Sequence, residues 1–357
     1  MFVSIISTKI GQNCPLPEGF QFYFVITIPS AAFGFALGII ISTVFRKWNK
    51  TTFLLFWSAT LLFPIVEIFY NPQIYIFNPI LGFFPGTIYD EDIAINLKML
   101  SYRVIILLFS IIVISLSIKL KNSKKVKRAI LFLSVLLSVV IFLFIKPELG
   151  FASTIGSIES ELNGRVNTPH FTIIYSGRIS KKKIKNIALH HEYYYHVLSS
   201  VLKDSISGKI ISFVFYNNAE KRKLFGAGNA DVAKPWLKQI YTTREHFDAT
   251  LKHELAHIFS ANYGWSIFKV AKNFNPANNF GNSDIDYVAA NAKKNGIDFK
   301  ISSLFSGFNF FDRTSSISYV YAGSFIKYLL RNYGAEQVKK VYSDLDFKKH
   351  FNKNLAQ

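Results

Sequence analysis

The sequence predicts four membrane-spanning helices followed by one α+β domain. Half of its 357 residues are hydrophobic, and the longest apolar runs all lie before Lys146. After that point shorter β-rich and amphipathic segments alternate with polar and basic residues. A bilayer-spanning helix needs about 20 mainly apolar residues, whereas a globular domain is built from mixed segments. We therefore divide the chain into residues 1–146 and 147–357.

The first region contains four apolar segments of near-spanning length. We predict helices at about residues 22–45, 51–70, 99–118 and 129–146. The first and last are free of charge up to residue 145, and the middle two carry one charge each, Glu67 and Arg103. Each of these charges lies near the end of its segment, where it can reach the membrane interface, or where the two could pair if the helices are neighbours.

Basic residues in the short loops predict the orientation of these helices. Three follow the first helix, Arg46, Lys47 and Lys50, and six separate the third from the fourth, Lys119, Lys121, Lys124, Lys125, Lys127 and Arg128. Short loops rich in Lys and Arg stay in the cytoplasm. The N-terminus and the whole of residues 147–357 should then lie outside, in a multi-pass protein of the cell membrane whose partner is the lipid bilayer. Because topology explains both basic clusters, no nucleic-acid partner is expected.

Composition limits the other possibilities. The formal charge is +19, which is unusual beside so much apolar sequence in a soluble enzyme. The single cysteine, Cys14, excludes an intrachain disulfide. The predicted helices contain almost no ionisable residue, so a transporter or channel is disfavoured.

The second region begins with strand and helix patterns. Residues 170–176 and 209–216 are rich in β-branched and aromatic residues and predict strands, and residues 180–202 between them have helical spacing. Residues 236–242 alternate and predict another strand. Thr242 to Glu245 fits a capping box, so a helix should begin about two turns before His253 and run towards Gly264.

That helix carries the pentad His253-Glu254-Leu255-Ala256-His257. Histidines four apart share one helix face and can bind one Zn²⁺, while the glutamate between them can take a proton from water beside the ion. His253 and His257 are therefore candidate metal ligands, and Glu254 is the candidate general base. The alternative is two histidines that share a helix face by chance.

A catalytic zinc usually has a third protein ligand. Asp284 or Asp286 could provide it, although an acid in the first turn of a helix more often complements the helix dipole, and we expect Ser283 or Asn282 to cap that helix. Glu336, far downstream at the start of a predicted surface helix, is given little weight.

A second histidine-rich stretch, residues 190–196, resembles a metal cluster. His191 and His196 are five apart, however, and should point away from one another on a helix. We interpret His190, His191 and the three neighbouring tyrosines as a packed amphipathic face. His246, two turns before His253, is too far away to share its ion.

Three stretches of the chain resemble the peptidase MA-like group, gluzincin-type HExxH zinc metallopeptidases, and in particular bacterial multi-pass membrane members. They read GAGNADVAKPW, TLKHELAHIF and SYVYAGSFIKYLLRNYG, and FFPGTIYDED in the outward loop is similar to the same membrane group. The likeness covers most of the chain. It implies a zincin-like metallopeptidase fold for residues 147–357, zinc bound by His253 and His257, Glu254 as general base, and a strand at residues 234–242 that pairs with extended substrate.

The chain departs from this group at one place. Its members usually carry a glutamate ligand between the HExxH helix and the AGSF helix, whereas NFNPANNFGNSD contains no glutamate. A weaker likeness, to the G-x-x-D-x-x-Y pattern of aspartate-liganded zinc peptidases, falls on Gly281, Asp284 and Tyr287.

Two functions follow from these residues. The first is a membrane-anchored zinc metallopeptidase that hydrolyses peptide bonds of a peptide or protein substrate outside the cytoplasm. The alternative is a catalytically impaired relative that acts as a membrane-attached binding or assembly protein, because two histidines alone hold zinc poorly. The substrate and the oligomeric state are left open by the sequence.

Overall fold

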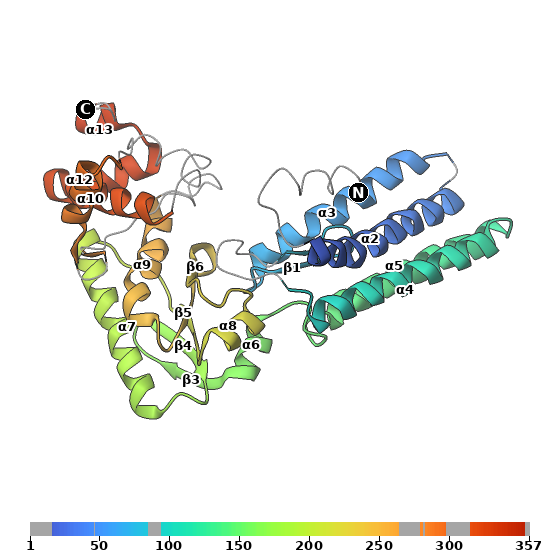
Figure 1. Cartoon of the computed structure of the whole chain (residues 1–357), viewed down its shortest axis with the longest axis horizontal. Coiled ribbons are helices and arrows are strands. Elements are labelled where there is room, and N and C mark those ends of the chain that lie inside the picture. The colour runs from blue at the N-terminus through green and yellow to red at the C-terminus, as the bar shows by residue number, and fades with distance from the viewer. Residues whose placement is uncertain are drawn as a thin grey trace. The chain divides into compact units, whose positions relative to one another are not determined.

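The computed structural model describes residues 16–45, 47–84, 94–263, 279–280, 283–297 and 315–353 (Figure 1). Contacts between residues divide the chain into two compact units. The first unit contains Met1–Ser160 together with Arg222–Asn229, and the second contains Glu161–Lys221 together with Ala230–Gln357. The division expected at 146/147 falls inside the first of these units.

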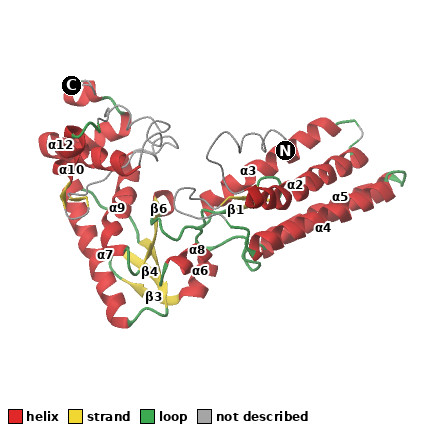
Figure 2. Ribbon diagram, viewed as in Figure 1, coloured by secondary structure: helices red, strands yellow, loops and turns green. Residues whose placement is uncertain are grey.

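The four predicted apolar helices are present. They are α2 (Leu16–Val44), α3 (Asn49–Tyr70), α4 (Leu97–Leu120) and α5 (Lys125–Ile145), drawn as long red ribbons in Figure 2. All four are long and apolar enough to cross a membrane, and only 6% to 33% of their most apolar windows is buried inside the protein. So much apolar surface left uncovered is consistent with a membrane protein.

Two of these helices contain a proline, and each proline leaves a carbonyl without its helical amide partner. Pro29 in α2 leaves the oxygen of Val25, to which Arg103 Nε of α4 donates at 3.0 Å. Pro64 in α3 leaves the oxygen of Thr60, to which the side-chain amide of Asn78 donates at 2.8 Å. Polar side chains from elsewhere in the unit therefore compensate both interruptions.

Arg103 is almost fully buried, and its guanidinium is saturated with acceptors. Besides Val25 it donates to backbone oxygens of Ile26, Asn78 and Pro79 and to the hydroxyl of Ser30. One side chain thus joins α4 to α2 and to the backbone at Asn78 and Pro79.

Glu67 pairs with Lys146, which corrects the suggestion that it could pair with Arg103. Lys146 Nζ lies 2.6 Å from both carboxylate oxygens, and both side chains are buried. Arg103 instead binds backbone oxygens of α2, the helix against which α4 packs most extensively.

Three short elements complete the first unit. β1 (Ile76–Asn78) and β2 (Gly82–Phe84) form an antiparallel hairpin, and α6 (Ile155–Leu162) follows the apolar helices. Residues 222–229, which belong to this unit, contact the segment before β1. Ile74 N donates to the oxygen of Phe225, and Gly226 (φ +115°) approaches Tyr75 so closely that an added Cβ would lie 2.9 Å from the Tyr75 ring. A side chain at residue 226 would disrupt this contact.

A mixed five-stranded sheet forms the centre of the second unit. Its strands are β3 (Asn163–Asn167), β4 (Phe171–Ser176), β5 (Ile210–Phe215), β6 (Val232–Lys234) and β7 (Gln239–Thr243). The order is β3-β4-β5-β7-β6, with the central three strands parallel and both edge strands antiparallel to their neighbours. β4 and β5 confirm the predicted strands, whereas β3 and β6 were not expected.

Helices and 3-10 turns connect and follow these strands. They are α7 (Lys181–Leu202), α8 (Asn218–Leu224), the 3-10 turn η1 (Pro235–Leu237), α9 (Phe247–Ser260) and the 3-10 turn η2 (Ala261–Tyr263). α7 confirms the predicted helix, and Ser180 caps it. α7 and α9 pack against each other through a core that includes Ile187, Leu198, Leu251 and Leu255, all without solvent exposure.

The C-terminal part of the second unit is mainly helical. Its elements are β8 (Asn279–Phe280), β9 (Ser283–Asp284), α10 (Ile285–Lys294), α12 (Ser315–Asp344) and α13 (Phe347–Phe351). α12 contains the AGSF stretch and is interrupted at Gly334 (φ 75°), so Glu336 begins a new helical segment as predicted. Its side chain is exposed and pairs with Lys339.

Candidate metal centre

Helix α9 presents the pentad, and the strand before it sets where the helix begins. β7 ends at Thr243, and α9 starts four residues later at Phe247, close to the predicted position. The predicted capping box is wrong in detail. Thr242 Oγ1 donates to Asp231, Thr243 Oγ1 accepts from the amide of His246 at 3.2 Å, and Glu245 contacts Arg244. Both threonines are buried at the end of β7, which leaves only Thr243 oriented to cap.

The two pentad histidines face each other. Their Nε2 atoms lie 3.0 Å apart and their rings are nearly perpendicular, at 89°. Two nitrogens bound to one tetrahedral zinc at 2.0–2.1 Å would be separated by about 3.3 Å, so a small rotation of either ring is enough to share an ion. Burial, and then the nearby His253, lower the pKa of His257 to about 3. His257 is therefore a neutral imidazole, the form that binds a metal.

Glu254 is buried at 6% exposure, on the side of α9 next to the sheet. Burial and the negative charge of Asp231 raise the pKa of its carboxyl to about 8, while a hydrogen bond from the backbone of Ala233 in β6 and the charge of Lys221 act in the opposite direction. A carboxyl with a pKa near neutrality can both accept and release a proton under physiological conditions.

A buried polar network supports this arrangement. Lys221 and Asp231 form an ion pair with side chains 0% and 1% exposed, and Asp231 also accepts hydrogen bonds from Thr242 of β7 and Thr250 of α9. Thr250 lies one turn before Glu254 on α9. Asp231 therefore fixes the turn of α9 that carries Glu254 to the end of β7.

Sequence reasoning missed this network because its members are far apart along the chain. The available signal was composition. Asp231 directly follows the small-residue stretch GAGNA and is the only acid between Glu220 and Glu245 in the sequence. The segment GAGNADVAKPW, which resembles the peptidase MA-like group, includes Asp231, but that resemblance assigned no role to it.

The strand with a free edge differs from the one expected. Residues 234–242 were expected to pair with extended substrate, but β7 within that range is hydrogen-bonded to β5 on one side and to β6 on the other. β6 lies at the end of the strand order in this sheet. On this side of the sheet an added strand would have to pair with β6 and not with β7, and the backbone of Ala233 in β6 also contacts Glu254.

Asp284 lies at the N-terminus of α10. Its carboxylate accepts from the amide of Asp286 at 2.8 Å and binds Lys327 Nζ at 2.7 Å, so Asp284 itself caps the helix in place of Ser283 or Asn282. Its side chain is half exposed. The described residues bring no third histidine, cysteine or acid within 4.8 Å of both pentad imidazoles, and Asp284 as a ligand remains a prediction. Gly281, part of the pattern that suggested it, lies outside the described residues.

The histidine-rich helix α7 separates its histidines as expected, but it also forms an unexpected cluster. His191 is fully buried, with Nδ1 2.8 Å from the oxygen of Ile187 and Nε2 2.8 Å from Ser212 Oγ, and burial lowers its pKa to about 4. Glu192 and His196 instead meet His170, which precedes β4. The missed signal was the four-residue spacing of Glu192 and His196, which places them on one helix face.

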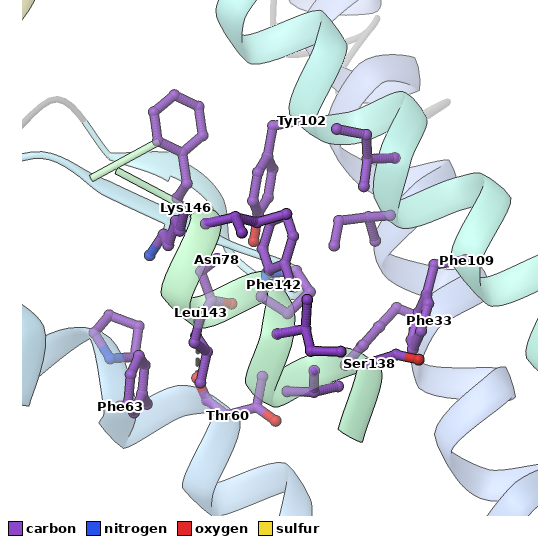
Figure 3. A pocket seen from close by; sticks show the side chains of 18 of the residues that line it. Phe33, Thr60, Phe63, Asn78, Tyr102, Phe109, Ser138, Phe142, Leu143 and Lys146 are labelled. Carbon is purple, nitrogen blue, oxygen red and sulfur yellow. Dashed lines mark hydrogen bonds between the residues drawn. The ribbon is translucent and has the colours of Figure 1, made fainter. Parts of the chain in front are cut away.

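The first unit contains a cavity of a different kind. It has a volume of about 540 Å³ and lies among the apolar helices, as Figure 3 shows, with Phe33, Phe63, Phe109 and Phe142 among its walls. Lys146 at its border is already paired with Glu67. No histidine, cysteine or acid lines it among the described residues.

Comparison with known proteins adds no relative. No protein-family model, curated protein or solved structure matches this sequence.

Proposed function

We propose that the chain is a membrane-anchored zinc metallopeptidase of the peptidase MA-like kind. The observation that carries the proposal is the pair of imidazole Nε2 atoms 3.0 Å apart on α9, with the buried carboxyl of Glu254 between them in sequence. His253 and His257 would hold the ion. Zinc bound there would polarise the scissile carbonyl and the attacking water.

The chain's own residues would perform the proton transfers. Glu254 would accept a proton from the attacking water and deliver it to the departing amine. Asp231 would keep the first turns of α9 against β7 while this happens, because it accepts hydrogen bonds from both Thr250 of α9 and Thr242 of β7. The exposed edge of β6 would bind the substrate backbone as an added strand.

Orientation and location belong to the same proposal. The basic loops after the first and third apolar helices support a cytoplasmic position for both, with the second unit outside the cell membrane. Protease digestion of intact cells should then degrade the second unit and spare the two basic loops. Digestion of the second unit only after lysis would contradict this orientation.

Glu254→Gln tests the mechanism in the full chain purified in detergent. Glutamine keeps the shape of the side chain but cannot accept the proton, so hydrolysis of a quenched-fluorescence peptide library should fall about 10²- to 10⁴-fold while zinc stays bound. The matched control is Glu245→Gln, since Glu245 is exposed and its carboxylate pairs with the adjacent Arg244. Unchanged hydrolysis in Glu254→Gln would exclude Glu254 as the base.

The second candidate is a binding or assembly protein without turnover. It is favoured by one observation, that Asp284 is engaged with Lys327 and the amide of Asp286 instead of the two histidines. In that case the wild-type protein should hold zinc weakly and hydrolyse no member of the library. Stoichiometric zinc that is lost in His253→Ala, together with hydrolysis, would support the peptidase instead.

A further inference from the structure

His170, Glu192 and His196 form a second cluster of potential metal ligands in the second unit. One ligand atom from each lies within 4.8 Å of the others. Two imidazoles and one carboxylate are a ligand set typical of zinc and of related divalent transition metals. The cluster shares no residue with the pentad on α9.

A regular helix and the start of a strand hold the backbone of these three residues in place. Glu192 and His196 are four apart on the 22-residue helix α7, so they project from the same face. His170 comes immediately before β4, and its carbonyl accepts from Ile210 N at the start of β5 at 2.9 Å. A site built on a helix and a strand end needs only side-chain adjustment to bind an ion.

Neighbouring groups already orient two of the three side chains. The His170 ring stacks on Tyr195 with centroids 3.8 Å apart. Glu192 Oε1 accepts from the backbone N–H of His170 at 3.0 Å, which leaves Oε2 directed at His170 Nδ1, 2.6 Å away. Hydrogen bonds that fix a ligand in this way are the usual support of protein metal sites.

The third side chain lies on the open side of the cluster. His196 is exposed, and its ring stands edge-on to His170 with centroids 5.4 Å apart. An ion between His170 and Glu192 would replace the proton that they now share, and His196 would close over it from the solvent side. Water could occupy the fourth position.

We propose that His170, Glu192 and His196 bind a divalent transition-metal ion, with Zn²⁺ the best match, at a site that joins α7 to the start of β4. The site is separate from the proposed peptidase centre. Its role is structural, because the ion would link a helix to a strand end across 22 residues of sequence.

Zinc counting on the full chain tests this proposal. The protein is purified in detergent without a histidine tag, stripped with a chelator and titrated with ZnCl₂, and bound metal is measured after dialysis. Wild type should bind two equivalents, and His196→Ala and Glu192→Gln one each. The matched control is His190→Ala, an exposed histidine of the same helix whose partner is Asp248, and it should keep both equivalents.

The variants separate this site from the proposed active centre. The double variant His253→Ala/His257→Ala should keep one equivalent, and zinc should still raise its Tm, whereas adding His196→Ala should abolish both effects. If wild type binds one equivalent that is lost only in His253→Ala/His257→Ala, the second site does not exist and the peptidase centre stands. If that single equivalent is lost only in His196→Ala, the second site stands and the zinc peptidase fails. No bound zinc in wild type would overturn both.

Discussion

The buried charges in the two units of this protein have different surroundings. In the first unit, Arg103 is surrounded by five oxygen acceptors and the Glu67 carboxylate is ion-paired with Lys146 at 2.6 Å. The second unit also contains a buried ion pair, Lys221 with Asp231, but adds two partly buried imidazoles whose Nε2 atoms lie 3.0 Å apart. Glu254, adjacent in sequence to one of them, has a buried carboxyl whose pKa is raised by burial and by another acid.

This difference distinguishes buried charges that stabilise the fold from groups that can bind a ligand or transfer a proton. A buried cation that is fully hydrogen-bonded to backbone oxygens holds helices together and has nothing left to offer a ligand. Facing imidazoles and a carboxyl with a raised pKa are instead the arrangement found where metals and protons are handled. The proposed peptidase chemistry therefore belongs to the second unit, whereas Arg103 and Glu67 hold the helices of the first unit together.

The largest predicted effect concerns the buried ion pair between Lys221 and Asp231 in the second unit. Asp231→Asn removes the anion beside Lys221, both of which are buried, and should lower the free energy of unfolding by about 3–5 kcal/mol. Thermal unfolding of the detergent-solubilised chain measures it. The control Asp248→Asn changes an exposed acid paired with His190 and should have little effect.

A double replacement tests whether the unpaired charge of Lys221 causes the loss of stability. Replacing both members, Asp231→Leu with Lys221→Met, should recover much of the lost stability because no unpaired charge is left buried. If Asp231→Asn unfolds at the same temperature as Asp248→Asn, the network does not hold α9 in place.

The next effect belongs to the first unit. Arg103→Leu removes the donor to the Val25 oxygen that Pro29 leaves without an amide, together with four further bonds, and should cost about 3 kcal/mol. The readout is the Tm of the full chain in detergent. Lys119→Gln, an exposed basic residue of the same helix, serves as the control. Equal Tm values for the two variants would show that Arg103 is not structural.

The last effect concerns Lys234, where burial lowers the pKa from 10.5 to about 7. Between these values the unfolded chain binds more protons than the folded one, so the free energy of unfolding of the wild type should rise with pH. Lys234→Met removes that slope. The stability of the variant relative to wild type should therefore be greatest at pH 7 and should fall towards pH 10.

Thermal unfolding of both proteins across this pH range gives the comparison. Lys209→Met, which replaces an exposed lysine, should show no such change relative to wild type. An advantage of Lys234→Met that is constant with pH would mean that lost charge is not its cause.

Local patterns predicted most of the regular structure. The four apolar helices, α7, β4 and β5 follow from hydrophobic length and periodicity, which act over a few turns or residues. β3 and β6 were missed because edge strands are short and half polar, as Asn163–Asn167 illustrates with alternating partial exposure. Such a strand is stabilised mainly by its neighbour.

In the candidate site, too, the sequence predicted the features that depend on residues close along the chain and missed the contacts between distant ones. The i, i+4 spacing of His253 and His257 predicts that the two rings share a face, and the structure adds that their Nε2 atoms meet. Spacing could not show that Asp284 binds Lys327, 43 residues away, or that His170 joins Glu192 across 22 residues. These contacts depend on how the strands and helices pack.

The sequence by itself determined the apolar helices, the α+β character of the remainder and the helical presentation of the pentad, because each depends on interactions between residues close along the chain. Only the folded chain shows the partner of each buried charge. Arg103 donates to backbone oxygens, Asp231 is ion-paired with Lys221, and Glu254 is buried against the backbone of β6. The physical reason is that burial and partner choice arise from contacts between residues far apart in sequence, and these contacts set the charge state and reactivity of each group.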